Sequence, residues 1–162
     1  MGSIQGLVVQ IRKKEKEVTD VSVMESLLQR AETMRLAFCD GDEPYIVPLS
    51  FGYQDGVIFI HSAKEGRKLG LIRHSKKVCF EVDSYKTVKK DLPCKWTMDY
   101  TSVIGLGEAE LVEGRDEKKK ALDVIMAHYG AVPPFEYSEA ALSKMLVIRI
   151  AVRSMTCKRS LG

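Results

Sequence analysis

Apolar residues recur with two different periods along this chain, and the change of period separates the expected helices from the expected strands. Near the start they repeat at i, i+3, i+4 and i+7, at Met24, Leu27, Leu28 and Ala31. This spacing predicts an amphipathic helix that begins at Asp20 or at a capping box formed by Ser22 and Glu25. A second helix is expected over residues 116–129, because an acidic start leads into apolar positions and Gly130 follows.

From residue 36 onward the pattern is typical of β-strands. Runs of β-branched and aromatic residues are separated by turns rich in Gly, Asp and Pro. Asp55-Gly56 predicts a tight hairpin turn. Pro48 cannot donate to a ladder, so its strand is expected to be locally unpaired, bulged or at an edge. The expected strands cover residues 36–39, 45–53, 57–61, 78–83, 98–112 and 145–152. Residues 84–97 are expected to form a polar loop.

The order of these elements predicts a mainly β fold, a six-stranded antiparallel barrel with peripheral α-helices. Closure into a barrel is a common way to remove exposed sheet edges. A chain of 162 residues is of a size for one domain with a sizeable core. No repeat or linker divides it, so we expect a single domain over residues 1–162, with a lead-in over 1–18 and a C-terminal tail over 154–162.

Composition and charge exclude several classes of protein. The chain is 45% hydrophobic, and its net charge of +3 is too small to indicate a nucleic-acid partner. No apolar run approaches the ~20 residues that span a bilayer, and a signal-peptide pattern is absent, so we expect a cytoplasmic protein without a membrane partner. The four cysteines form no C-x-x-C pair, which favours reduced thiols over a zinc site or disulfides. Cys94, in a polar stretch, is the one expected to be exposed.

Candidate chemistry gathers where the strand over 57–61 leads into a basic segment. If a helix begins near Ala63, then Lys64, Arg67 and Lys68 lie at i, i+3 and i+4 on one face. Cations oppose the helix dipole at an N-terminus, and a bound phosphate would reverse that penalty. The segment therefore indicates either a phosphate site or a solvated basic helix.

Two glycines in the expected strand over 98–112 indicate a special packing position. Gly105 and Gly107 share one strand face, which predicts a sharp bend or close approach by another backbone or a ligand.

His74 and His128 lie late in helices, where a cation suits the dipole, and we interpret both as structural. His61 ends a strand where the chain leaves the sheet, so it is either a hydrogen-bonded structural residue or a group of the site.

Three segments, in this order, resemble the flavin-binding split barrels of the pyridoxamine 5′-phosphate oxidase-like superfamily. They are Pro44–Tyr53, the segment His61–Lys68 with its His-Ser-Ala and Gly-x-Lys residues, and the strand Tyr100-x-Ser102-Val103-Ile104-x-x-Gly107. The likeness extends over residues 20–152 and is greatest to the nitroimidazole-resistance branch. The resemblance implies a six-stranded antiparallel split barrel that forms a homodimer, with FMN at the subunit interface.

The resemblance also implies which residues would hold the flavin. The strand end and the helix that follows would hold its phosphate, and the strand before the Asp-Gly turn would offer backbone groups to the isoalloxazine edge. Ser102 would lie near the flavin or its ribityl chain, from the same or the second subunit. The implied cofactor-binding residues are Val47, Pro48, Leu49, Ser50, Ile60, His61, Ser62, Arg67, Lys68 and Ser102.

The implied activity is that of an FMN-dependent oxidoreductase. A nicotinamide donor, NADH or NADPH, would reduce the flavin, and a nitroaromatic or quinone-like small molecule would accept the electrons. His61 is the one candidate catalytic residue, and no metal site is expected. Pyridoxamine phosphate oxidation is not expected, because the C-terminal Trp and Arg motif of true oxidases is absent. Deazaflavin or haem is an alternative cofactor, and a non-catalytic flavin or haem carrier or sensor is the alternative function.

Overall fold

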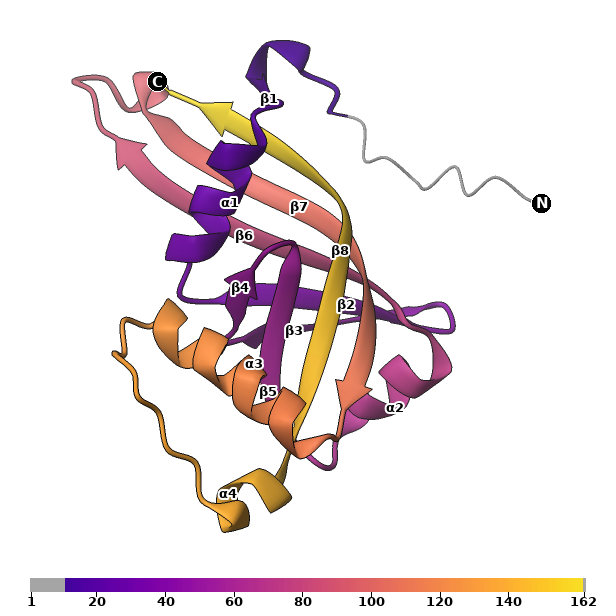
Figure 1. Ribbon diagram of the computed structural model, residues 1–162. Helices are drawn as coiled ribbons and strands as arrows, with labels where there is room; N and C mark the ends of the chain where they lie inside the picture. The colour runs from indigo at the N-terminus through magenta and orange to yellow at the C-terminus, as the bar shows by residue number, and fades with distance from the viewer. Residues whose placement is uncertain (1–10, 162) are drawn as a thin grey trace.

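The computed structural model describes residues 11–161, and its strands join into one sheet in which every pair is antiparallel (Figure 1). Hydrogen-bonded neighbours follow the order β3-β2-β6-β7-β8-β5-β4, with β1 beside β8. The strands are β1 (Glu17–Val18), β2 (Met34–Asp40), β3 (Glu43–Leu49), β4 (Gly52–Gln54), β5 (Val57–Ala63), β6 (Lys77–Val88), β7 (Thr97–Val112) and β8 (Met145–Ser160). The helices are α1 (Val21–Arg30), α2 (Arg67–His74), α3 (Arg115–His128) and α4 (Glu139–Ser143), with 3-10 turns η1 (Lys14–Lys16) and η2 (Pro93–Lys95).

The predicted mainly β fold with peripheral helices is confirmed, but the expected count of six strands is wrong. There are eight strands, because Ser50 and Phe51 divide the expected strand over 45–53 and because β1 forms in the lead-in. The sheet path begins at β3 and ends at β4, and these two do not pair within the described residues, so the barrel is not closed. Pro48 lies in β3, which pairs only with β2, and the predicted edge position is confirmed.

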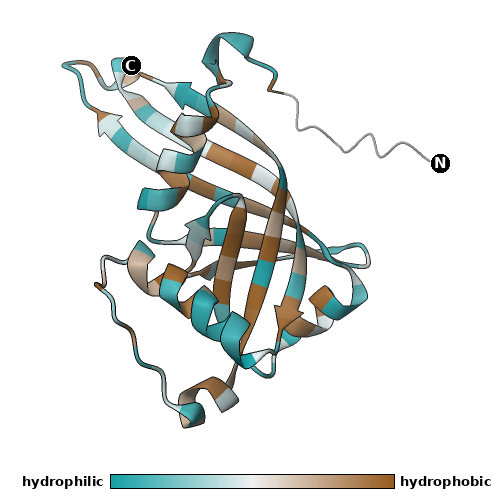
Figure 2. Ribbon diagram, in the orientation of Figure 1, coloured by the Kyte–Doolittle hydropathy of each residue, from teal (hydrophilic) through white to brown (hydrophobic). Residues whose placement is uncertain are grey.

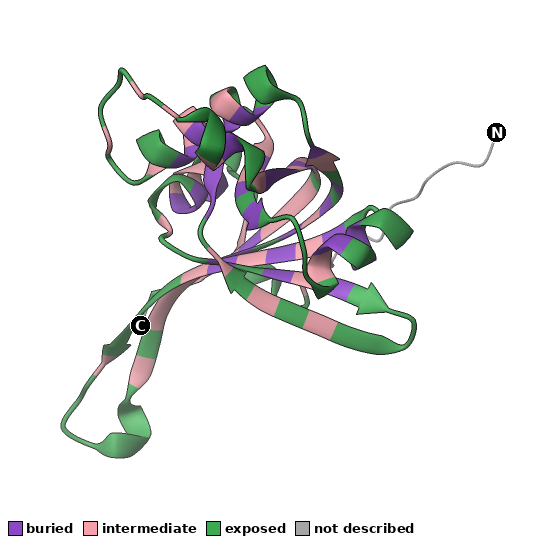
Figure 3. Cartoon of the chain, turned by 90° about the horizontal axis from the view of Figure 1, so that it is seen from below, coloured by how far each residue is buried: buried purple, intermediate pink, exposed green. Residues whose placement is uncertain are grey.

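Strands β6 and β7 run beyond the body of the molecule as a hairpin, which we call the arm (residues 85–100) (Figure 3). Their ladder continues to Val88 opposite Thr97, so the predicted polar loop over 84–97 is wrong. The expected C-terminal tail from residue 154 is also wrong, because β8 pairs with β7 as far as Ser160. Neither segment has a fully apolar face, which is why its residue pattern did not indicate a strand.

The main hydrophobic core lies on the inner face of the curved sheet. Alternate residues of β6 are buried there, as the period of two predicts, while the residues between them face outward. Helix α1 covers this face with Met24, Leu27 and Leu28, and α2 adds Leu69 and Ile72. Figure 2 shows the hydrophobic residues concentrated along the strands and the hydrophilic ones on the outward side of α3. No helix within residues 11–161 is long and apolar enough to cross a bilayer.

Helix α1 is held by a cap and by one buried phenol. The Asp20 carboxylate accepts the backbone N–H of Ser22 at 2.9 Å, so the predicted start at Asp20 is confirmed. The alternative capping box does not form, because Glu25 instead accepts the hydroxyl of Tyr53 at 2.8 Å. Tyr53 is 7% exposed. Burial and the bond to Glu25 raise the pKa of Tyr53 to about 12.

Helix α3 packs on the outer side of β4, β5 and β8. Gly52 permits this contact, because a Cβ there would lie 2.8 Å from the backbone of Ile125. At the end of α3, Nε2 of His128 lies 2.8 Å from the carbonyl oxygen of Ala31, and its ring packs on Phe51. These contacts join α3 to the end of α1 and confirm the structural role predicted for His128.

The paired glycines of β7 serve packing inside the protomer. A Cβ at Gly105 would lie 2.1 Å from the ring of Phe80, and one at Gly107 would lie 2.6 Å from Ile150. The ladder with β8 also shifts register between Leu106 and Gly107, which bends the strand. The predicted close approach is therefore made by side chains of this chain, and neither glycine is evidence for a second subunit.

Gly105→Ala should destabilise the protein by about 1–3 kcal/mol, because the added methyl overpacks the site of the Phe80 ring. Gly70→Ala is the matched control: Gly70 lies in α2, where an added Cβ would have nothing within 4 Å, and alanine there should stabilise by about 0.5–1 kcal/mol. Urea unfolding measures both. A Gly105→Ala protein as stable as wild type would show that Phe80 moves aside without cost.

Alkaline pH should weaken the fold through Tyr53. Its pKa is about 12 in the folded protein against 10.0 for an unperturbed phenol, so its stabilisation is complete below pH ~10 and is lost as pH rises through ~12. The stability difference between wild type and Tyr53→Phe in urea unfolding should therefore shrink from about pH 9 to about pH 11. Tyr85→Phe, an exposed phenol, is the control. A difference independent of pH would contradict the expectation.

Candidate cofactor site

The end of β5 and the start of α2 form the framework of the candidate site. β5 continues to Ala63, and α2 begins at Arg67, so the expected helix start near Ala63 is wrong. Lys64 therefore precedes the helix and does not share a helical face with Lys68. The chain turns at Gly66, whose φ of 132° suits only glycine. Gly66 is the N-cap and provides no side-chain hydrogen bond to the first turn.

Two sheet edges lie open where β5 leaves the barrel. The ladder between β4 and β5 ends at Gly52 opposite Phe59, so β5 beyond that point pairs only with β8. β3 pairs only with β2, without interruption. Pro44 and Pro48 are four residues apart in β3, so their nitrogens point to the same side of the strand. That side is the free edge, because the ladder with β2 is uninterrupted, and the two prolines remove two N–H donors from it. This edge resists pairing with another strand and keeps its carbonyl oxygens available.

The side chains at the end of β5 alternate between core and surface. Ile60 is buried in the main core. Ser62 is also buried, and its hydroxyl donates to the carbonyl oxygen of Ala63 at 3.0 Å. His61 is exposed, and its imidazole has no hydrogen-bond or ion-pair partner among residues 11–161. Of these three side chains, His61 alone is available to a ligand in this conformation.

Arg67 already has anionic partners within the protomer. Its guanidinium donates to the Asp40 carboxylate at 2.9 Å, lies 3.4 Å from Glu43, and stacks 4.7 Å from the ring centroid of Tyr45. The bond to Asp40 raises the pKa of Arg67. These contacts attach α2 to the β2–β3 hairpin and offset part of the cation's conflict with the helix dipole. Lys68 and the exposed Lys64 have no such carboxylate partner within residues 11–161.

The predicted site residues lie mostly on and just after β3, at the end of β5 and at the start of α2. Val47 and Leu49 pack against the core, whereas Pro48 and Ser50 are exposed. They lie between the hairpin held by Arg67 and the start of β4, which pairs with β5. The predicted Ser102 lies on a different strand, β7, opposite Asp83 of β6. Pro48 lies opposite Arg35, which lies opposite Glu81 of β6, so Pro48 and Ser102 are at nearly the same level of the sheet but on strands that are not neighbours.

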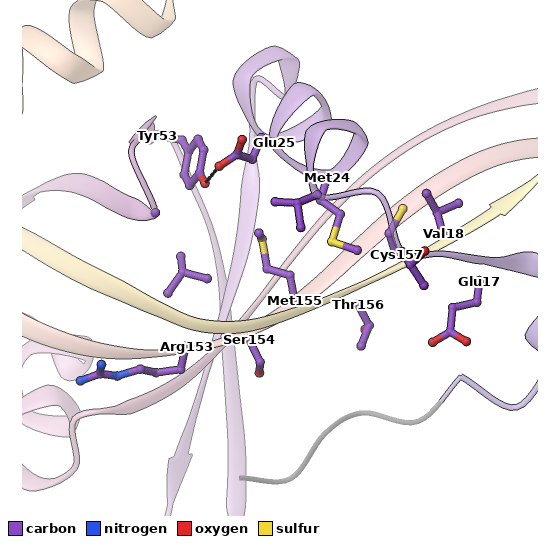
Figure 4. Close-up of a pocket in the computed structure, with 14 residues that line it drawn as sticks. Glu17, Val18, Met24, Glu25, Tyr53, Arg153, Ser154, Met155, Thr156 and Cys157 are labelled. Carbon is purple, nitrogen blue, oxygen red and sulfur yellow. Dashed lines mark hydrogen bonds between the residues drawn. The ribbon is translucent and has the colours of Figure 1, made fainter.

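A cavity that no sequence pattern indicated lies between α1, β1, β4 and β8, apart from the predicted site residues (Figure 4). Its volume is about 500 Å³. The Tyr53–Glu25 pair forms its polar end, and Met24, Met155 and Cys157 contribute sulfur-bearing side chains to its lining. Burial raises the pKa of the Cys157 thiol, so this cysteine is unreactive. No signal in the sequence related Met24 to Met155, because they lie on a helix and a strand far apart in the chain.

All four cysteines are free, and Cys39 is exposed as well as Cys94, so the expectation that Cys94 alone is exposed is wrong. Cys39 follows the last pair between β2 and β6 and is therefore not covered by the neighbouring strand. Among residues 11–161, no group of three or more His, Cys, Asp or Glu side chains is arranged to hold a metal ion.

Comparison with known proteins places this geometry in a family. The family model described as pyridoxamine 5′-phosphate oxidase matches residues 20–159. A candidate 5-nitroimidazole antibiotic resistance protein from Bacteroides thetaiotaomicron has 31% identity and a TM-score of 0.80, with 88% of this chain and 86% of that chain covered. No curated protein matches the sequence.

Two further structures share the fold at lower identity. The FAD and haem binding protein from Mycobacterium smegmatis has 19% identity and a TM-score of 0.79, covering 91% of this chain and 74% of that one. A flavocytochrome from Azotobacter vinelandii has 17% identity and a TM-score of 0.77, covering 94% and 73%. The family match spans most of the chain and the strand-to-helix framework. The chain therefore belongs to the pyridoxamine 5′-phosphate oxidase-like superfamily of flavin-binding split barrels and is similar to its nitroimidazole-resistance branch.

Proposed function

We propose that this protein is a cytoplasmic, homodimeric FMN-dependent oxidoreductase that passes electrons from a nicotinamide donor to a nitroaromatic or quinone-like acceptor. The observation that carries the proposal is the end of β5. The strand ends there with the exposed His61 on an edge that pairs only with β8, and the helix that follows, α2, has no side-chain cap at its start. Four free thiols support a reducing compartment.

The start of α2 has the donors that a phosphate needs. The first-turn N–H groups receive no side-chain cap from Gly66, and such groups bind anions together with the helix dipole. Lys68, in the first turn, supplies positive charge without a competing carboxylate, whereas the exposed Lys64 precedes the helix. Arg67 would act indirectly, by holding the β2–β3 hairpin against α2, unless the phosphate displaces Asp40 from its guanidinium.

The open edges of β3 and β5 have the backbone groups that a planar heterocycle needs. The carbonyl oxygen of Pro48, at the free edge of β3, and the exposed imidazole of His61 would orient the isoalloxazine ring, beside the side chains of Val47 and Leu49. When bound, FMN supplies the hydride and electron transfer, and the protein supplies binding, orientation and control of access. Within residues 11–161 the imidazole of His61 has no hydrogen-bond or ion-pair partner, which is compatible with such a division.

The choice of acceptor is supported by one neighbour. The Bacteroides protein, at 31% identity over 88% of this chain, is described by resistance to 5-nitroimidazoles, so nitroaromatic compounds are the first acceptors to test. A second candidate function is a flavin or haem carrier without turnover. It is favoured by two neighbours that are described as a haem-binding protein and a flavocytochrome, and the exposed His61 would be the available haem ligand.

Spectra and anaerobic reduction test the proposal directly. The purified protein should show flavin absorption after loading with FMN. NADH or NADPH should bleach it without oxygen, and a nitroaromatic compound should restore it. A Soret band after loading with haem, together with no flavin binding, would favour the carrier. Bound flavin that neither nicotinamide donor reduces would refute the oxidoreductase.

FMN should bind at least about tenfold more tightly than riboflavin, because charge-assisted hydrogen bonds contribute roughly 1.5–3 kcal/mol each. Titration of both flavins against the apoprotein measures this preference. Lys68→Ala should reduce the preference, whereas Lys64→Ala is the matched control and should change it little, since a single exposed cation contributes under ~1 kcal/mol. Equal affinities for the two flavins would show that the start of α2 is not a phosphate site.

His61→Ala should weaken cofactor retention while the apoprotein melts at nearly the wild-type temperature. The side chain is exposed, so its removal avoids the ~2–5 kcal/mol cost of a large-to-small change in a core. His61→Gln, which keeps a donor at similar reach, should restore part of the binding. Flavin affinity and apoprotein melting are measured on the same preparations. Early unfolding with intact affinity would instead make His61 a structural residue.

A further inference from the structure

The cavity between α1 and β8 exists because β8 changes partners along one edge. Its ladder with β5 ends at Ala151, and the N–H of Val152 adds one bond to the carbonyl oxygen of Gly56 at 3.0 Å. The ladder with β1 begins only at Cys157. Within residues 11–161, the backbone over 153–156 therefore has no strand neighbour on this side. Helix α1 lies over the gap and leaves a cavity of about 500 Å³ (Figure 4).

One end of this cavity is polar and negatively charged. The Tyr53 hydroxyl donates to the Glu25 carboxylate at 2.8 Å, and this carboxylate has no cationic partner among residues 11–161. Burial is the main cause of the raised pKa of Tyr53, and the bond to Glu25 and the charge of Asp55 add to it. A carboxylate can accept several hydrogen bonds, so Glu25 can accept a second donor from a ligand.

The other charged residues that line the cavity are neutralised by partners of their own. The Glu17 carboxylate lies 2.9 Å from Nζ of Lys14. The guanidinium of Arg153 donates to Glu108 at 2.8 Å and points away from α1 (Figure 4). Within the described part of the chain, Glu25 is thus the one charged group of the lining without a counter-charge. This charge favours a cationic ligand over a neutral or anionic one.

The rest of the lining suits an aromatic body. Met24 on α1 and Met155 on β8 point toward one another across the cavity, and the Cys157 sulfur lies on the same side of β8 as Met155 (Figure 4). Thioethers make favourable contacts with aromatic rings, and their unbranched chains adapt to the shape of a ligand. The volume lies within the range of roughly 300–1,000 Å³ that small-molecule sites have.

We propose that this cavity binds an amphipathic organic cation, an amine with an aromatic body. Its ammonium would donate to Glu25 beside the Tyr53 hydroxyl, and its ring would lie between the thioethers of Met24 and Met155. The lining shares no residue with the candidate flavin site on β3, β5 and α2. The inference therefore goes beyond the proposed function and does not depend on it.

Tryptamine and its neutral analogue tryptophol test the charge directly, because they differ only in an ammonium and a hydroxyl group. In calorimetric titration of the whole chain, tryptamine should bind at least about tenfold more tightly, as expected where a charge-assisted hydrogen bond replaces a neutral one. Excess FMN should leave the tryptamine affinity unchanged. Equal affinities, no binding of tryptamine, or competition with FMN would each overturn the proposal.

Two carboxylate variants locate the binding. Glu25→Gln keeps an acceptor for the Tyr53 hydroxyl and removes the charge, so it should reduce the tryptamine affinity about tenfold and leave that of tryptophol unchanged. Glu17→Gln is the matched control, because Glu17 lines the same cavity but is paired with Lys14. Both affinities should there equal those of the wild type. An equal loss in the two variants, or no loss in Glu25→Gln, would contradict the assignment.

Val21→Trp tests the place of the ligand without altering Glu25. Val21 lines the cavity and is 55% exposed, so a larger side chain there obstructs the cavity without overpacking the core. Tryptamine should bind at least about tenfold more weakly to this variant, because the indole would clash with the new side chain. Thermal melting of each variant shows whether it is folded. A folded Val21→Trp protein with wild-type tryptamine affinity would place the ligand elsewhere and refute the proposal.

Discussion

The ladder between β7 and β8 is the constraint on which the rest of the structure depends. Each strand is 16 residues long, and they pair from Tyr100 opposite Ser160 to Val112 opposite Val147. β6 adds to one side of this pair and β5 to the other, so the arm and the candidate site occupy fixed positions at its two ends. The register shift at Leu106 and Gly107 bends both strands, and without that bend β5 and β2 would not curve around a common core.

The candidate site exists because the barrel stays open. A closed barrel would pair β3 with the remaining edge of the sheet and consume the backbone groups there. Pro44 and Pro48 oppose this closure by removing donors from the free edge of β3, while its ladder with β2 is intact. The early end of the β4–β5 ladder leaves the matching half of β5 unpaired on one side. An open edge, which is a liability on an ordinary edge strand, is here the surface that we propose for cofactor binding.

Helix caps and turns, which depend on neighbouring residues, could be predicted from the sequence, whereas the pairing of segments far apart in the chain could not. Asp20, the turn at Asp55-Gly56 and the stop at Gly130 act through neighbouring backbone, and the structure has Asp20 as the cap and positive φ values at the other three residues. The arm was missed because its strands lack a buried face on which a period of two would show. The glycines of β7 predicted a bend or a close approach, but not what approaches, because their neighbours on β6 and β8 are not apparent from spacing within one strand.

The ion-pair partners of the cations at the site could not be predicted either, because they are distant in the sequence. Three positive charges near one helix start indicated either a bound phosphate or a solvated basic helix, whereas in the structure Asp40 and Glu43 supply two carboxylates to Arg67 from a hairpin 24 or more residues earlier in the chain. A phosphate at α2 would therefore meet Lys68 and uncapped N–H groups first, and it would gain Arg67 only by breaking an ion pair that holds β2 and β3 in place. The same guanidinium cannot serve both partners fully, so in the site that we propose the strength of phosphate binding and the attachment of the hairpin would be coupled through Arg67.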